Sequence, residues 1–136
     1  MQINWLGIGL GLVAGMAVAG VWYGKLFVQL WWDLTGITPQ QTKAASRRNM
    51  VQLLIANAVT ALGLGFAVAV VDAATGTQSV WLALLVGAVA ALTLSVTTLL
   101  QHNAFELKPA KLTLLNCAYQ LALFLATSLM IGLVRV

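Results

Sequence analysis

Hydrophobic residues fill four long stretches of the chain, and the charged residues lie between these stretches and at the very end. The uncharged stretches are residues 1–24, 49–71, 73–105 and 112–134. Each is at least as long as the roughly 20 residues that a helix needs to cross the hydrocarbon core of a bilayer. The pattern therefore predicts an all-α fold, an integral membrane bundle of four transmembrane helices.

The limits of the four helices follow from the same pattern. We expect them at about residues 5–24, 50–71, 80–100 and 112–134, in a single transmembrane domain of residues 1–136. No basic residue precedes the first predicted helix, which indicates a retained helix rather than a signal peptide. Thr38, Pro39 and Gln41 have the spacing of a capping box. This spacing predicts a helix that begins at Pro39 and continues into the second span.

The composition excludes a water-soluble domain. Hydrophobic residues make up 61% of the chain and charged residues only 7%, whereas a soluble domain carries about 25% charged residues. The net charge of +4 does not indicate nucleic acid as a partner, because the basic residues are few and lie at helix ends. Cys117 is the only cysteine and is expected to be a small buried hydrophobe.

The basic residues predict the orientation of the chain. Six of the seven lie in the connections 25–49 and 101–111, and none lies in the connection 72–79. Basic residues near membrane-spanning helices favour the cytoplasmic side. We therefore expect a protein of the cytoplasmic (inner) membrane in which these two connections face the cytoplasm and both termini face the outside. Arg135 is the one exception. Lys43 and Arg47 share a helix face at headgroup level, either as a positive-inside anchor or as a phosphate site.

Two sets of residues are expected to place the helices in the bilayer. Aromatic side chains that prefer the headgroup region stand near the predicted span ends: Trp5, Trp22, Tyr23, Trp31, Trp32 and Trp81. Small residues that let helices approach closely recur at every fourth position in each span. They are Gly7, Gly11 and Gly15; Ala61, Gly65 and Ala69; Gly87, Ala91 and Ser95; and Ala118, Ala122 and Ala126. We expect the face that carries Gly7, Gly11 and Gly15 to pack against another helix.

Polar residues mark a candidate site near the cytoplasmic border. No Asp, Glu, Lys or Arg lies deep in a span, which argues against a proton-coupled pump or a small multidrug exporter. We expect one connected group, with Lys108 or Lys111 as the partner of Glu106. Asn103, Glu106, Asn116 and Tyr119 are expected to form this connected group, within a candidate polar cluster of Asn57, Asn103, Glu106, Lys108, Asn116, Tyr119 and Gln120. Either this group supplies hydrogen bonds between helices, or it forms a ligand or ion site.

Catalytic and metal-binding patterns are missing from the sequence. His102 and Glu106 have a spacing of four residues, but two ligands are too few for a closed metal site. We find no nucleophile, base and orienting residue at a suitable spacing. The sequence therefore predicts a protein that is not an enzyme and has no cofactor and no metal site.

Three motifs carry a resemblance to a known family. They are Ile3-Asn4-Trp5, then Trp22-Tyr23-Gly24-Lys25-Leu26-Phe27, and then Asn103 to Leu112 with Asn116, Tyr119 and Gln120 after it. The chain resembles a bacterial family of small membrane proteins catalogued as a domain of unknown function, although Lys25 stands where many relatives have proline. The resemblance implies a four-helix membrane protein with a shared structure at the inner ends of spans one, three and four. It implies no activity.

Two functions are compatible with these features. The first is a structural or accessory subunit that packs in the lipid bilayer with itself or with a larger membrane complex. The alternative is a small transporter or channel, with a pathway lined by Asn57, Asn116, Tyr119 and Gln120 and gated near Glu106. A water-filled cavity that reaches Asn116 and Gln120 would favour transport, whereas a dry bundle would favour the accessory role.

Overall fold

The computed structural model describes residues 1–134 as a helical bundle. The elements are α1 (Trp5–Val21), the π-helix η1 (Trp22–Leu26), α2 (Val28–Thr35), α3 (Pro39–Thr75), α4 (Val80–Ala90), the π-helix η2 (Ala91–Ser95), α5 (Val96–Phe105) and α6 (Ala110–Leu133). Four continuous helical segments are long and apolar enough to cross a membrane: Trp5–Leu26, Pro39–Thr75, Val80–Phe105 and Ala110–Leu133. The predicted all-α bundle is confirmed in the part of the chain that is described.

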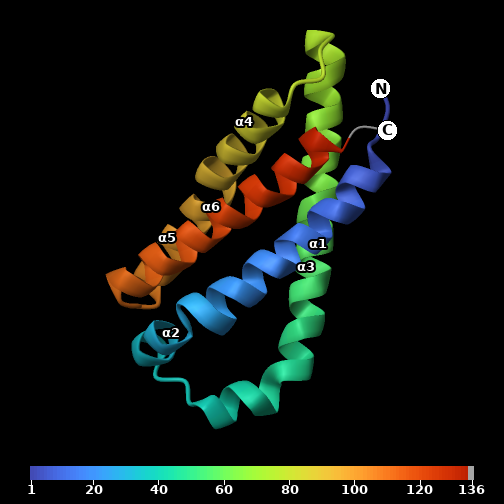
Figure 1. Cartoon of the computed structure of the whole chain (residues 1–136). Helices are drawn as coiled ribbons and strands as arrows, with labels where there is room; N and C mark the ends of the chain where they lie inside the picture. The colour runs from blue at the N-terminus through green and yellow to red at the C-terminus, as the bar shows by residue number, and fades with distance from the viewer. Residues whose placement is uncertain (135–136) are drawn as a thin grey trace.

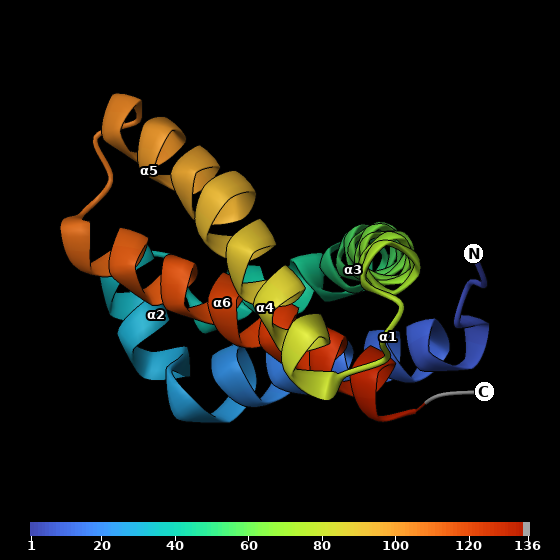
Figure 2. The ribbon, with the colours of Figure 1, turned by 90° about the horizontal axis from the view of Figure 1, so that it is seen from above.

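The helices are arranged around α6, which lies between α1 and α4 (Figure 1). α1 and α6 run antiparallel in the most extensive contact of the bundle. α3 crosses this pair steeply, and in Figure 2 most of its turns are seen end-on while α1 and α6 lie lengthwise. Because α3 crosses at such an angle, it packs closely on the bundle at one end and separates from α1 at the other.

The two ends of the bundle differ in charge. Six of the basic residues belong to η1, the first turns of α3, the connection from α5 to α6 and the first turn of α6, and Figure 1 shows these segments at the same end. We call this end the basic end. The other, the terminal end, holds the N-terminus, the end of α6 and the connection between α3 and α4. Arg135, the exception to the predicted charge bias, lies outside the described residues.

The apolar core lies in the half of the bundle toward the terminal end. It consists of buried residues from four helices: Ile8, Ala61, Leu64, Val68, Ala83 and Ile131. Close helix approach makes this core dense, since a Cβ atom added at Gly65 would overlap the side chain of Ile8. Lipid does not drive membrane helices together by a hydrophobic effect, so such close packing is the main source of their association.

Glycines of α1 provide the contact surface for α6. A Cβ atom at Gly11 would lie 3.0 Å from Thr127 Cγ2 and 3.1 Å from the Thr127 carbonyl oxygen, and one at Gly15 would lie 2.8 Å from Leu123 Cδ1. Gly7 instead lies under the side chain of Asn4. Gly11 and Gly15 thus belong to the face that packs on α6, whereas Gly7 makes room for the cap of its own helix.

The small residues of the fourth span lie beside the most buried face of α6 and not on it. Ala118, Ala122 and Ala126 are only half-buried, and the buried face of α6 carries larger side chains, including Leu123 and Thr127. The glycines of α1 leave room for these larger side chains. Close contact therefore needs small residues on only one of the two helices.

Asn4 joins the two ends of the described chain. Its side-chain oxygen accepts a hydrogen bond from the Gly7 amide at 2.9 Å and caps α1. Its side-chain nitrogen donates to the carbonyl oxygens of Ile131, at 2.9 Å, and Val134. Carbonyl groups in the last turn of a helix have no partner within the helix, so Asn4 also satisfies the end of α6.

The predicted start of α3 is confirmed. The Thr38 hydroxyl accepts from the Gln41 amide at 3.1 Å, and the Gln41 side chain accepts from the Thr38 amide at 2.9 Å. α3 then continues without interruption to Thr75. At about 1.5 Å per residue it is roughly 55 Å long, which is longer than the hydrocarbon core of a bilayer is thick, about 30 Å.

Candidate functional site

A groove of about 380 Å³ lies between α1 and α3 in the half of the bundle toward the basic end, beside α2. Its size is in the range of ligand sites. Most of the lining is apolar, and polar side chains come mainly from the first turns of α3. The lining residues are Met16, Ala19, Gly20, Tyr23, Gly24, Val28, Trp31, Thr42, Ser46, Asn49, Met50, Leu53 and Tyr119.

α2 bounds the groove because two contacts hold this short helix against its neighbours. The Trp32 indole nitrogen donates to the Thr42 hydroxyl at 3.0 Å, and the Trp31 ring meets the Tyr23 ring edge-on at 6.0 Å between centroids. Gly36 ends α2 with a φ of 71°, a left-handed conformation that glycine adopts without strain. The chain can therefore turn at once toward the start of α3.

The inner wall of the groove is an aromatic and amide cluster around Tyr23. The Tyr23 hydroxyl donates to the side-chain oxygen of Asn116 at 2.6 Å. The rings of Tyr23 and Tyr119 pack edge-on at 4.8 Å, and Trp22 lies 6.3 Å from Tyr119 between ring centroids. The Asn57 amide donates weakly to the sulfur of Met16 at 3.4 Å. This wall joins α1, η1, α3 and α6.

Two polar atoms of this wall are buried without a hydrogen bond. One is the Trp22 indole nitrogen, and the other is the Tyr119 hydroxyl. The Tyr119 hydroxyl lies beside the Asn57 side chain, but the two do not form a hydrogen bond of normal geometry. Buried polar groups in native proteins nearly always have a hydrogen-bond partner. These two atoms are exceptions, and they leave the polar wall incompletely paired.

The predicted polar cluster is divided into separate sets rather than joined as one group. Asn57, Asn116 and Tyr119 gather around Tyr23, as described above. The side-chain oxygen of Gln120 accepts from the Ser95 hydroxyl at 3.1 Å, in a contact between α6 and η2. No hydrogen bond among the described residues links these two sets.

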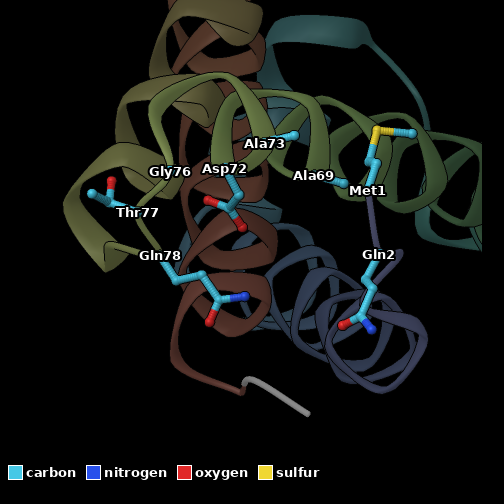
Figure 3. Close-up of a pocket in the computed structure, with 8 residues that line it drawn as sticks. All are labelled: Met1, Gln2, Ala69, Asp72, Ala73, Gly76, Thr77 and Gln78. Atoms are coloured by element: carbon cyan, nitrogen blue, oxygen red, sulfur yellow. The ribbon is translucent and has the colours of Figure 1, made fainter.

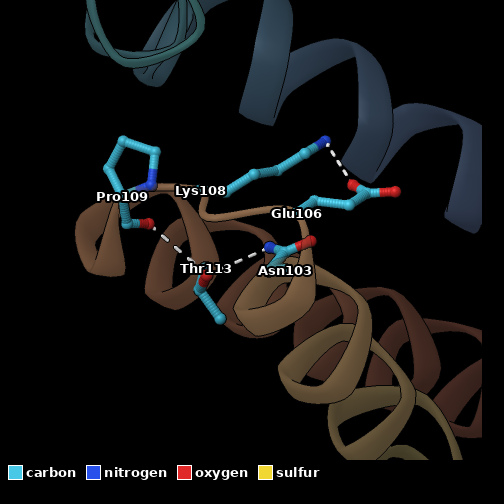
Figure 4. A network of polar contacts seen from close by, with 5 residues as sticks. All are labelled: Asn103, Glu106, Lys108, Pro109 and Thr113. Carbon is cyan, nitrogen blue, oxygen red and sulfur yellow. Dashed lines mark hydrogen bonds and ion pairs between the residues drawn. The ribbon is translucent and has the colours of Figure 1, made fainter.

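The remaining residues of the predicted cluster lie at the connection between α5 and α6 (Figure 4). Lys108 and Glu106 form an ion pair at 3.3 Å, as expected, and both side chains are about half exposed. Asn103 instead donates to the Thr113 hydroxyl at 3.0 Å. Leu107, between Glu106 and Lys108, has a φ of 55° and turns the chain after α5. The ion pair is exposed, whereas Asn103 is buried.

The aromatic residues predicted as headgroup anchors differ in how exposed they are. Trp5 and Trp81 are 62% and 76% exposed, near the terminal end. Trp22 and Tyr23 are half-buried and pack against Tyr119. They begin the wider turn of η1 and face α6. Trp31 and Trp32 are half-buried beside the groove.

A second hollow, of about 570 Å³, opens at the terminal end (Figure 3). It is bounded by the first two residues, the last turn of α3 and the connection to α4, and Asp72 contributes its one carboxylate. The apolar core lies between this hollow and the groove. The described residues include no cluster of three or more His, Cys, Asp or Glu side chains that could hold a metal ion.

Comparison with known proteins identifies the family. The model of a family described as "Protein of unknown function (DUF1761)" matches residues 6–132. The chain belongs to the DUF1761 family. The match includes every residue of the groove and of its inner wall. No curated protein and no solved structure matches the chain.

Sequence reasoning missed the hydrogen-bond partners in this DUF1761 protein. Tyr23 was expected at the headgroups, and neither Ser95 nor Thr113 was placed in the candidate cluster. A signal for Tyr23 was present, since the motif Trp22-Tyr23-Gly24 and the residues Asn116 and Tyr119 carry the same family resemblance. The structure brings these marked residues into one wall.

Proposed function

We propose that this DUF1761 protein is an accessory protein of the cytoplasmic membrane that binds another membrane component in its groove, and that it is neither an enzyme nor a transporter. The groove between α1, α2 and α3 is the observation that carries this proposal. None of its lining residues is acidic or basic. Binding of an apolar component needs no charged group, whereas acid–base chemistry most often uses His, Asp, Glu or Lys.

Packing in the other half of the bundle argues against the alternative of a transporter. A pathway would have to continue from the groove through the core around Ile8, Leu64 and Ile131, where the helices are in close contact. Asn116 and Gln120, the expected lining of such a pathway, are instead engaged with Tyr23 and Ser95. These contacts favour a binding site that is closed toward the terminal end.

Purification of the full chain in mild detergent, with identification of what copurifies, tests this function. Gly20 lines the groove and has no atom within 4 Å of an added Cβ, so Gly20→Leu should fill the groove without strain. Gly9 is equally open but lies outside the groove, which makes Gly9→Leu the matched control. We expect a component that copurifies with the native chain and with Gly9→Leu but not with Gly20→Leu.

Two outcomes would contradict the accessory function. One is a set of copurifying components that is the same for all three chains. The other is solute flux through proteoliposomes that Gly20→Leu abolishes and Gly9→Leu leaves intact, which would establish the groove as part of a transport pathway.

We further propose that the basic end faces the cytoplasm and that both termini lie outside. The support is the gathering of six basic residues at one end of the bundle. In a Cys117→Ala background, an impermeant thiol reagent applied to intact cells should label Thr77→Cys and not Gln40→Cys; both positions are exposed, at opposite ends. Labelling of Gln40→Cys alone would reverse this topology.

A further inference from the structure

We propose that the component bound in the groove is an anionic glycerophospholipid of the inner leaflet, with an acyl chain inside and the headgroup at the first turns of α3. The inference rests on the proposed function, because it names the occupant of the same groove. Three properties of the groove support it: its width, the order of its polar and apolar lining, and the charge around its polar end.

The width of the groove suits a hydrocarbon chain better than a helix of another protein. Along α3 the lining extends from Thr42 to Leu53, roughly 16 Å at 1.5 Å per residue. A volume of about 380 Å³ spread over that length gives a channel roughly 8 Å across once the radius of a water molecule is added at each wall, narrower than the roughly 10–12 Å of an α-helix with its side chains. Carbon atoms in contact lie about 4 Å apart, so an extended hydrocarbon chain fits this channel.

The lining of the groove changes from polar to apolar along its length. Thr42, Ser46 and Asn49 offer hydroxyl and amide groups in the first turns of α3. Leu53, Met16 and Ala19 follow deeper in the bundle. A phospholipid has this same order of polar headgroup and apolar chain, in the same direction relative to the bilayer.

The charge around the polar end favours an anionic headgroup. Residues 25–49 carry four basic side chains and one acidic side chain. Lys43 follows Thr42 directly, whereas the acidic side chain, Asp33, already accepts a hydrogen bond from Gln29 at 3.0 Å. A basic side chain near the membrane surface attracts anionic lipid by about 1 kcal/mol, which corresponds to about a fivefold preference.

Native mass spectrometry of the full chain, released from nanodiscs of defined composition, tests the inference. The probes are phosphatidylglycerol and phosphatidylcholine with identical acyl chains. We expect one tightly retained phosphatidylglycerol, preferred about fivefold or more over phosphatidylcholine. Gly20→Leu should lose both lipids and Gly9→Leu neither. Ser46→Trp, at an exposed groove position, should also reduce retention if Gly20→Leu does not fold.

Charge variants separate headgroup recognition from general attraction to the basic end. Lys43→Gln, next to the lining residue Thr42, should reduce the preference for phosphatidylglycerol about fivefold. Lys111→Gln, at the same end but in the first turn of α6 and next to no lining residue, should leave the preference unchanged. Equal retention of the two lipids by the native chain, or full lipid retention by both Gly20→Leu and Ser46→Trp, overturns the inference. If a protein still copurifies only when the groove is open, the lipid inference fails and the accessory function stands.

Discussion

Replacement of Gly11 by leucine is expected to lower the free energy of unfolding by about 3 kcal/mol, the upper part of the range for overpacked contacts. An added Cβ would lie 3.0 Å from Thr127 Cγ2 and 3.1 Å from the Thr127 carbonyl oxygen. The carbonyl belongs to the backbone of α6 and cannot move aside as a side chain would. The remaining atoms of leucine would therefore push α1 away from α6 and open the most extensive helix contact of the bundle.

Thermal unfolding in mild detergent, followed by tryptophan fluorescence, measures this effect. Gly9→Leu is the control, because it adds the same side chain to the same helix where nothing lies within 4 Å of the new Cβ. Gly9→Leu should melt like the native chain, and Gly11→Leu should melt well below it. Equal melting temperatures for the two variants would show that the α1–α6 contact is not close at Gly11.

The length and number of the helices could be predicted from the sequence because they follow from one physical requirement. A helix that crosses a bilayer needs about 20 apolar residues, and a charged side chain within it is costly in free energy. The capping box at Thr38 could also be predicted, because it is a local pattern whose two partners are only three residues apart. The crossing angle of α3 has no such signal, because it depends on how side chains of several helices fit together.

Small residues illustrate why the contacts between helices were harder to predict than the limits of the helices. Each span has glycine, alanine or serine at every fourth position, but such spacing does not say which helix approaches. The structure uses Gly11 and Gly15 against larger side chains of α6, and it leaves the alanines of α6 half-buried. Contact between two helices depends on the summed size of both surfaces, which one sequence pattern cannot reveal.

The groove could not be predicted for a related reason. It exists because α3 leaves α1 at the basic end and because η1 directs Trp22 and Tyr23 toward α6. A π-helical turn has one more residue than an α-helical turn, so the face of every later side chain shifts. Its place at the end of the first predicted span indicated a position at the membrane surface for Tyr23, whereas the structure pairs its hydroxyl with Asn116 on α6.

The hydrogen bond between Tyr23 and Asn116 is expected to be the most sensitive polar contact of the bundle. It joins η1 to α6 at 2.6 Å on the inner wall of the groove. Tyr23→Phe leaves the Asn116 oxygen without its donor, and Asn116→Leu leaves the Tyr23 hydroxyl without its acceptor. An unsatisfied buried polar group costs about 1–3 kcal/mol, so each single variant should lose roughly 1–2 kcal/mol of unfolding free energy.

The double variant Tyr23→Phe with Asn116→Leu separates this hydrogen bond from loss of packing. It removes both polar groups, so its loss should be smaller than the sum of the single losses by about 1 kcal/mol. Tyr119→Phe is the matched control, because it removes a hydroxyl from the same wall that makes no hydrogen bond. That variant should keep or slightly raise the melting temperature in detergent. Additive losses in the cycle, or a loss in Tyr119→Phe as large as that in Tyr23→Phe, would mean that the wall is held by ring packing and not by the Tyr23–Asn116 hydrogen bond.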